Sequence, residues 1–185
     1  MKKLFRKILV LAVVFGTFTS YANEVSEVNT SFGYVKKGNY ISVTDASGEV
    51  IYSEKIANNG NLKTHFDFRE LENGTYTVEV SKGFKIEIST IEVKNHLVTF
   101  IESNNKTIYK PLVRNENAYV LISKLALNSD NMRVELYFEG DLIHTETIKG
   151  EKVINRVYKL DKTLTGNYTT IIKSDDRVFV DNFRI

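Results

Sequence analysis

The histidines are the first residues in this chain that could carry acid–base or metal chemistry. There are three, His65, His96 and His144, and each lies in or beside a strand-like run, far from the other two in sequence. No HExxH, GxSxG or phosphate-binding loop motif occurs anywhere in the chain. The sequence therefore predicts no catalytic residues, no metal site and no cofactor.

Carboxylates are the second candidates, because paired acids can cleave glycosidic bonds. Glu54 and Glu146 occupy equivalent positions in two related stretches, and Asp175-Asp176 falls in a turn-like segment. Other acids alternate with Ile and Val, which is typical of solvated strand faces: Glu79, Glu87 and Glu92. We expect structural roles for all of them, and a protein that is not an enzyme.

Three tyrosines fall outside the predicted inward phase of their strands: Tyr52, Tyr109 and Tyr137. Exposed aromatic rings are platforms for sugars in many β-sandwiches. A carbohydrate-binding accessory module is therefore the alternative function, with a glycan as partner.

The N-terminus has the pattern of a secretory signal, predicted as residues 1–22. The basic segment MKKLFRK precedes the apolar run ILVLAVVFGTF, and Ser20 and Ala22 form a small-x-small cleavage site. The apolar run is shorter than the ~20 residues that span a bilayer, so no membrane span is expected after cleavage. Removal of the signal changes the formal net charge from +2 to −2, which speaks against a nucleic-acid partner.

The remaining chain is expected to be exported to the periplasm, the cell surface or the medium. It contains no cysteine, which excludes disulfides, thiol catalysis and cysteine-ligated zinc. Val, Ile, Thr, Tyr and Phe dominate, with a single proline, Pro111, and this composition favours strands.

Two-residue alternation predicts the strands. Tyr76, Val78 and Val80 share one face of TYTVEV, and VELYF alternates in the same way. Turn residues recur about every ten positions, which is typical of a β-sandwich or barrel.

A repeat divides the chain. Residues 48–93 match residues 140–185 at an offset of 92, and earlier positions match at 93. In both units the apolar alternation changes phase near the end, at Ser89-Thr90 and at Asp181-Asn182, which predicts a β-bulge or a kink at each place. We predict two tandem Ig-like domains, 23–95 and 96–185, the second consisting of a repeat unit (117–185) with leading strands (96–116) around a turn at 103–106.

Each unit also contains a Leu–Gly–Tyr signature. The signature residues, with the glycines of the preceding turns, are Gly48, Leu71, Gly74 and Tyr76 in unit one and Gly140, Leu164, Gly166 and Tyr168 in unit two. We expect Gly74 and Gly166 to supply a positive φ at a corner, the leucines to cap the core, and the tyrosine hydroxyls to satisfy backbone groups there. Two ordinary hairpins are the alternative interpretation.

The stretches ISVTDASGEVIYSEKI and FDFRELENGTYTVEV resemble Ig-like modules of secreted Bacteroidetes proteins, including the C-terminal sorting domains of the type IX secretion system. Asp45 to Gly48 and Leu71 to Tyr76 carry the resemblance in unit one, whereas unit two lacks the Asp. The resemblance implies an Ig-like fold and a cell-envelope setting. We therefore expect an exported, non-catalytic protein that acts by contacts with another envelope or surface protein.

Overall fold

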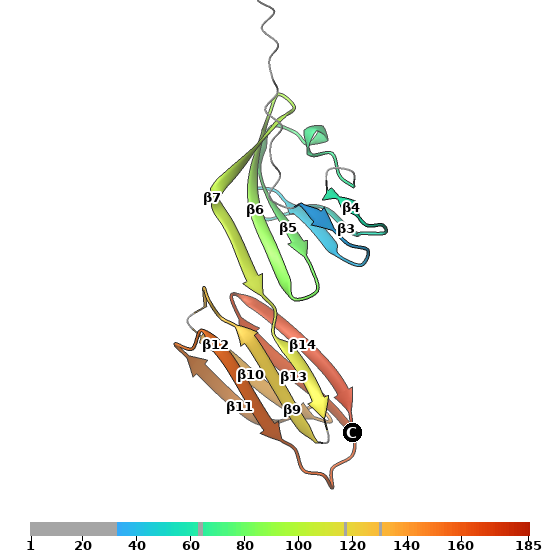
Figure 1. Cartoon of the computed structure of the whole chain (residues 1–185), viewed down its shortest axis with the longest axis vertical. Coiled ribbons are helices and arrows are strands. Elements are labelled where there is room, and N and C mark those ends of the chain that lie inside the picture. The colour runs from blue at the N-terminus through green and yellow to red at the C-terminus, as the bar shows by residue number, and fades with distance from the viewer. Residues whose placement is uncertain (1–32, 63–64, 117, 130) are drawn as a thin grey trace, which may run out of the picture.

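The computed structural model describes residues 33–62, 65–116, 118–129 and 131–185. The predicted signal peptide, residues 1–22, lies outside these ranges. The described chain is almost entirely strand and forms two β-sandwich domains that follow one another along the long axis of the molecule (Figure 1). The predicted all-β class is confirmed.

The first domain is built on a five-stranded antiparallel sheet. Its strand order is β3 (Val50–Lys55), β2 (Tyr40–Thr44), β5 (Gly74–Ser81), β6 (Lys85–Lys94) and β7 (Leu97–Tyr109). A small second sheet pairs β1 (Tyr34–Val35) with β4 (Gly60–Asn61), and the 3₁₀ helix η2 (Phe68–Glu70) precedes β5.

The second domain has two sheets of more equal size. The four-stranded sheet has the order β11 (Asp141–Lys149), β10 (Asn131–Phe138), β13 (Asn167–Ser174) and β14 (Arg177–Arg184). The three-stranded sheet has the order β12 (Val153–Lys159), β9 (Tyr119–Leu125) and β8 (Leu112–Glu116).

Each domain has its own apolar core. It is formed by the inward-facing residues of strands in which apolar and polar residues alternate. Val78 and Val80 of β5 are fully buried in the first core, and Val134 of β10 is fully buried in the second. The core therefore lies between the two sheets of each domain, as a period-two pattern requires.

The two larger sheets share a strand order and a register. β3-β2-β5-β6 corresponds to β11-β10-β13-β14. Ile41 is paired with Val80 in the first sheet, and the residues at the predicted offsets, Val134 and Ile172, are paired in the second. Equivalent strands of the two domains therefore meet at equivalent residues.

The predicted bulges are only half right. In the first domain the pairing of β6 with β7 shifts register between Ile88 and Thr90, where residues 102–105 of β7 lie opposite Ser89. β6 itself stays in register with β5, so the additional residues belong to β7. The phase change in the sequence thus predicts the position of the bulge along the sheet correctly, but it assigns the bulge to β6 and not to β7.

The second predicted bulge is wrong. β14 pairs with β13 without a shift through Asp181 and Asn182. Val178 and Val180 are exposed, while Phe179 and Phe183 pack on the core. Burying phenylalanine removes more apolar area from water than burying valine, so the aromatic phase takes the inward side.

The chain changes domain later than position 96. A two-residue turn at Asn95 and His96, with φ of 52° and 63°, returns β7 along β6, so residues 97–109 extend the first sheet. Positive φ at both residues is the type I′ geometry that suits a tight hairpin. The expected turn at 103–106 lies inside β7, within its bulged part. Pro111 stands between β7 and β8, where a missing N–H breaks no ladder.

Candidate interaction site at the domain junction

Lys110 anchors the connecting segment to the first domain at the point where β7 ends. Its Nζ donates to Ser81 Oγ at 2.7 Å and to the Lys82 carbonyl oxygen at 2.8 Å. Its backbone N–H donates to the Phe84 carbonyl oxygen at 2.9 Å. These bonds fix the β5–β6 hairpin of the first domain against the segment that leads into β8.

Lys124 forms a second tie beneath the same segment. Its Nζ donates to the Tyr109 carbonyl oxygen at 2.5 Å and lies 2.8 Å from Asp175 Oδ2. The side chains of Lys124 and Asp175 are 0% and 5% exposed. A buried ion pair persists only when its charges are well matched and hydrogen-bonded, and this pair meets that condition.

Arg177 makes the third tie, an ion pair from β14 to Glu79 on β5 of the first domain. Both side chains are partly exposed, so the pair contributes little energy. Together the three cations restrain the junction from several directions.

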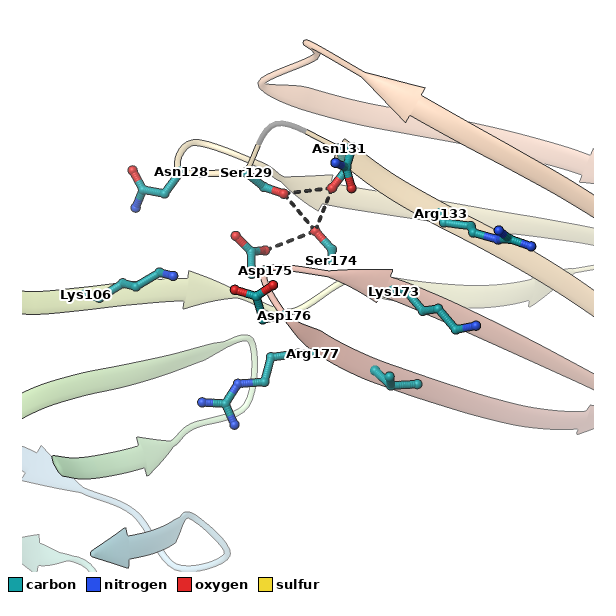
Figure 2. A pocket seen from close by; sticks show the side chains of 11 residues that line it. Lys106, Asn128, Ser129, Asn131, Arg133, Lys173, Ser174, Asp175, Asp176 and Arg177 are labelled. Carbon is teal, nitrogen blue, oxygen red and sulfur yellow. Dashed lines mark hydrogen bonds between the residues drawn. The ribbon is translucent and has the colours of Figure 1, made fainter. Parts of the chain in front are cut away.

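A polar cleft of about 570 Å³ opens beside this junction (Figure 2). At its base Ser129 Oγ lies 3.1 Å from Ser174 Oγ, and Ser174 Oγ donates to Asp175 Oδ2 at 3.1 Å. The same Asp175 Oδ2 is paired with the Lys124 ammonium. The network therefore links Ser129 and Ser174 to the buried ion pair of the junction.

Two further cations of the cleft wall, Lys173 and Arg133, form ion pairs as well. Lys173 Nζ lies 3.2 Å and Arg133 Nε 2.8 Å from Glu135 Oε1. No group of three or more metal-ligating side chains occurs in the described part of the chain.

An apolar groove of about 180 Å³ lies at the same junction. We call it the junction groove, and it is lined by Phe84 of the first domain, Tyr109 and Lys110 of the connecting segment, and six residues of the second: Ser123, Lys124, Leu125, Val153, Ile154 and Asn155. It therefore takes its walls from both domains.

The groove continues onto the outer face of the β8–β9–β12 sheet. Cross-strand pairing sets Val153 opposite Leu125 and Val157 opposite Leu121 on this face. Phe84, Val153 and Val157 are 67%, 59% and 63% exposed, and Leu112 on β8 is exposed on the same face. Contiguous exposed apolar patches on soluble proteins commonly mark interaction sites.

The predicted signature residues have structural positions. Gly48 and Gly140 have φ of 91° and 92° in the β2–β3 and β10–β11 turns. Gly74 and Gly166 do not have the expected positive φ. At Gly166 a Cβ would lie 2.4 Å from Glu139 Oε1 and 2.7 Å from Phe138 Cε2, so this glycine is needed for close approach.

Both tyrosines of the signature bond to the backbone of the preceding corner. Tyr76 Oη donates to the Glu72 carbonyl oxygen at 2.9 Å, and Tyr168 Oη donates to the Leu164 carbonyl oxygen at 3.0 Å. Leu71 packs on the first core, but the Leu164 side chain is exposed. The two corners thus share the hydrogen bond from the tyrosine hydroxyl, but they differ in whether the leucine side chain is buried.

The carboxylates at equivalent positions are bound by neighbouring side chains. Glu146 Oε1 accepts from Arg156 Nε at 2.9 Å, and Oε2 accepts from Tyr158 Oη at 2.7 Å. The bond from Tyr158, followed by Arg156, lowers the pKa of Glu146. In the first domain Glu54 accepts from Tyr52 and raises the pKa of that phenol to about 12. Glu146 therefore does not have the raised pKa of a general acid.

The remaining candidates are not brought together. The Tyr52 ring packs in a tilted arrangement against Phe66 at the edge of the first core. Tyr109 lines the junction groove, and Tyr137 donates to Glu135 on the outer face of the four-stranded sheet. The three tyrosines therefore form no common platform for a sugar.

The histidines are also separate. His96 Nδ1 lies 2.9 Å from the Arg69 carbonyl oxygen, and the His144 ring lies 5.2 Å from that of Tyr158. His65 Nε2 is buried without a hydrogen bond among the described residues. None of the three approaches another histidine in a metal-ligating group.

The junction lysines Lys110 and Lys124 and the groove residues Phe84 and Val153 are absent from the sequence-based candidates, although the sequence contains one indication of Lys124. Val120, Ile122 and Lys124 alternate in YVLISKL, which places a lysine in the buried phase of a strand. Buried lysines are paired almost without exception, so this position predicts a hidden acid. No local pattern identifies Asp175 as that acid.

Within the described ranges, no helix is long and apolar enough to cross a bilayer. No curated protein matches the chain. Residues 22–94, which include β1 to β6 of the first domain but not β7, match the family model described as the secretion system C-terminal sorting domain. The expected resemblance is thereby confirmed, and the first domain is similar to the sorting domains of a protein export system.

Proposed function

We propose that this protein is an exported tandem β-sandwich protein that binds another envelope or surface protein and catalyses no reaction. Export is implied by the match to a secretion sorting domain, and the predicted signal peptide supports it. The compartment in which it acts is the periplasm, the cell surface or the medium.

The observation that carries the proposal is the exposed apolar face of the β8–β9–β12 sheet. Outer faces of antiparallel sheets are normally polar where they meet water. Here Leu112, Leu125, Val153 and Val157 are all exposed on one such face. Exposure of this apolar area to water does not stabilise the fold. Its burial by a partner protein would stabilise the complex.

The restrained junction supports the same proposal. Lys110, Lys124 and Arg177 link the end of β7, the β5–β6 hairpin and the second domain. A preorganised surface loses less entropy on binding than a hinged one. Carbohydrate binding is not favoured by any grouping of aromatic residues, because the three tyrosines that suggested it lie on separate surfaces.

Site-specific photo-crosslinking in the source cells tests this function. A photoreactive amino acid at Leu121 on the apolar face should give a discrete adduct with one protein. The matched control at Thr145 lies on the exposed outer face of the other sheet and should give none. Equal labelling from both positions, or none from Leu121, would refute the proposal.

Fractionation supplies the second test. The protein should be recovered outside the cytoplasm, shortened at its N-terminus after Ala22. Retention of the intact chain in the cytoplasm would exclude the proposed role in the envelope.

A further inference from the structure

The junction groove contains one positive charge with no carboxylate beside it. Lys110 lines the groove wall, and two of its three N–H donors go to Ser81 and Lys82. Among the described residues no carboxylate forms an ion pair with it, and burial lowers its pKa. The other lysine of the groove, Lys124, is already neutralised by Asp175.

The rest of the groove is apolar and has the volume of a single large side chain. Phe84 stands on one side and Leu125 and Val153 on the other. Its volume of about 180 Å³ compares with the ~150 Å³ cavities that hold one benzene ring. A protruding apolar group therefore fills it better than a flat surface does.

Two of the three charged side chains on the adjoining face have the same sign as Lys110. Arg114 and Lys159 point outward from β8 and β12, and neither has an ion-pair partner in the described part of the chain. Glu116 is the opposing acid on this face. The complement of the surface is therefore apolar at its centre and acidic around it.

We propose that the junction groove binds an extended segment of a partner protein that inserts one large apolar side chain between Phe84 and Val153 and places a carboxylate against Lys110. This inference rests on the proposed function and specifies its partner. The carboxylate takes the third N–H of Lys110, and flanking acids lie against Arg114 and Lys159.

Two other occupants fit less well. A second copy docked by the same face would bring Arg114 and Lys159 toward their own counterparts, which is repulsive. A bilayer presents no side chain of a size to enter a concave groove set back between two domains. The partner's chemistry is thus that of an acidic protein segment with one bulky apolar residue.

A defined peptide tests the inference with the exported protein. In the peptide, aspartate alternates with valine around one central phenylalanine, and control peptides replace the aspartates by lysine or the phenylalanine by serine. Backbone amide NMR shifts should move at Lys110, Leu125 and Val153 with the first peptide only. Equal binding of the lysine peptide, or shifts confined to another surface, would overturn the proposal.

Variants separate the charge from the apolar anchor. Lys110→Met and Val153→Asn should each weaken binding at least about fivefold, while Lys110→Arg should retain most of it. Val153 is mostly exposed, so Val153→Asn leaves the core intact. Unchanged affinity in both Lys110→Met and Val153→Asn would contradict the proposed site.

Two further measurements address the other occupants. Analytical ultracentrifugation that finds a dimer broken by Val153→Asn would replace the partner with a second copy. Co-sedimentation with phosphatidylcholine–phosphatidylglycerol vesicles that is lost in Phe84→Ser would replace it with a membrane. A crosslink from Leu121 without binding of the peptide would contradict this inference alone, while the proposed function would still be supported.

Discussion

Lys124 Nζ and Asp175 Oδ2 lie 2.8 Å apart in a place that water scarcely reaches. The lysine also donates to the Tyr109 carbonyl oxygen, so one buried ammonium joins the last residue of β7 to the β13–β14 turn. Strand alternation predicts that the side chain of Lys124 is buried, but its partner Asp175 lies 51 positions later in the chain.

Asp175→Asn should lower the free energy of unfolding of the second domain by about 3–5 kcal/mol. The change leaves the Lys124 charge buried without its counter-ion, while asparagine keeps the positive φ of 54° that this turn position requires. Asp176→Asn is the matched control, since Asp176 has a similar φ of 56° and is exposed. Urea denaturation followed by circular dichroism measures both; equal stability of the two variants would contradict a buried pair.

A double variant should recover much of this loss. In Lys124→Met with Asp175→Asn no buried charge remains, and replacement of a buried pair by apolar groups is often near neutral. We expect a favourable coupling of more than about 1 kcal/mol in the double-mutant cycle. Additive effects would mean that the two side chains act independently.

Gly166→Ala should destabilise the protein by about 1–3 kcal/mol, whereas Gly74→Ala should cost less. At Gly166 the new methyl would clash with Glu139 and Phe138, but at Gly74 the nearest atoms, those of the Tyr76 ring, lie at 3.5 Å. Midpoints of thermal unfolding compare the two, and the reverse order would show that the close approach at Gly166 is not needed.

Tyr168→Phe removes a hydroxyl that donates to the Leu164 carbonyl oxygen at 3.0 Å. The loss should be about 0.5–1.5 kcal/mol, the usual net worth of one hydrogen bond. Tyr119→Phe serves as control, because Tyr119 is exposed on the outer face of β9. If the Tyr168→Phe protein is as stable as this control, the hydrogen bond of the Tyr168 hydroxyl contributes nothing to the free energy of unfolding.

Stability should fall in acid partly through Glu146. Hydrogen bonds from Tyr158 and Arg156 lower the pKa of Glu146 in the folded state below its unfolded value. Folding is then favoured above the unfolded pKa of about 4.3, and this contribution is lost as the pH falls through the folded pKa. Denaturation at several pH values should show a smaller acid loss in Glu146→Gln than in Glu116→Gln; equal slopes would exclude the contribution.

Arg177→Gln should loosen the junction with little change in domain stability. A partly exposed ion pair contributes less than about 1 kcal/mol, yet this one links β14 to Glu79 of the first domain. Spin labels at Ser53 and Thr145 should report a broader distance distribution than in the control Arg184→Gln. An unchanged distance distribution would mean that Lys110 and Lys124 alone restrain the junction between the domains.

The sequence by itself determined the class of fold and the position of most strands. Polar residues alternate with Tyr76, Val78 and Val80, which are buried. Burial of one side of a strand is a local property with a period of two residues, so it is visible in the sequence. The tyrosine corners were predictable for the same reason, since Tyr76 and Tyr168 each bond only four residues back.

The tertiary structure alone decided which strands meet. Residues 103–106 have the composition of a turn, yet they continue β7, because the Asn95–His96 hairpin brings the chain back beside β6. On β14 both phases are apolar, and only packing on the second core selects Phe179 and Phe183 over Val178 and Val180.

The junction belongs to the same category. Lys110, Asp175, Phe84 and Val153 come from four distant segments, and no spacing in the sequence relates them. Long-range pairing is set by the summed burial of whole sheets and not by the residues at the contact. The groove and its free ammonium therefore exist only once both domains have folded and docked.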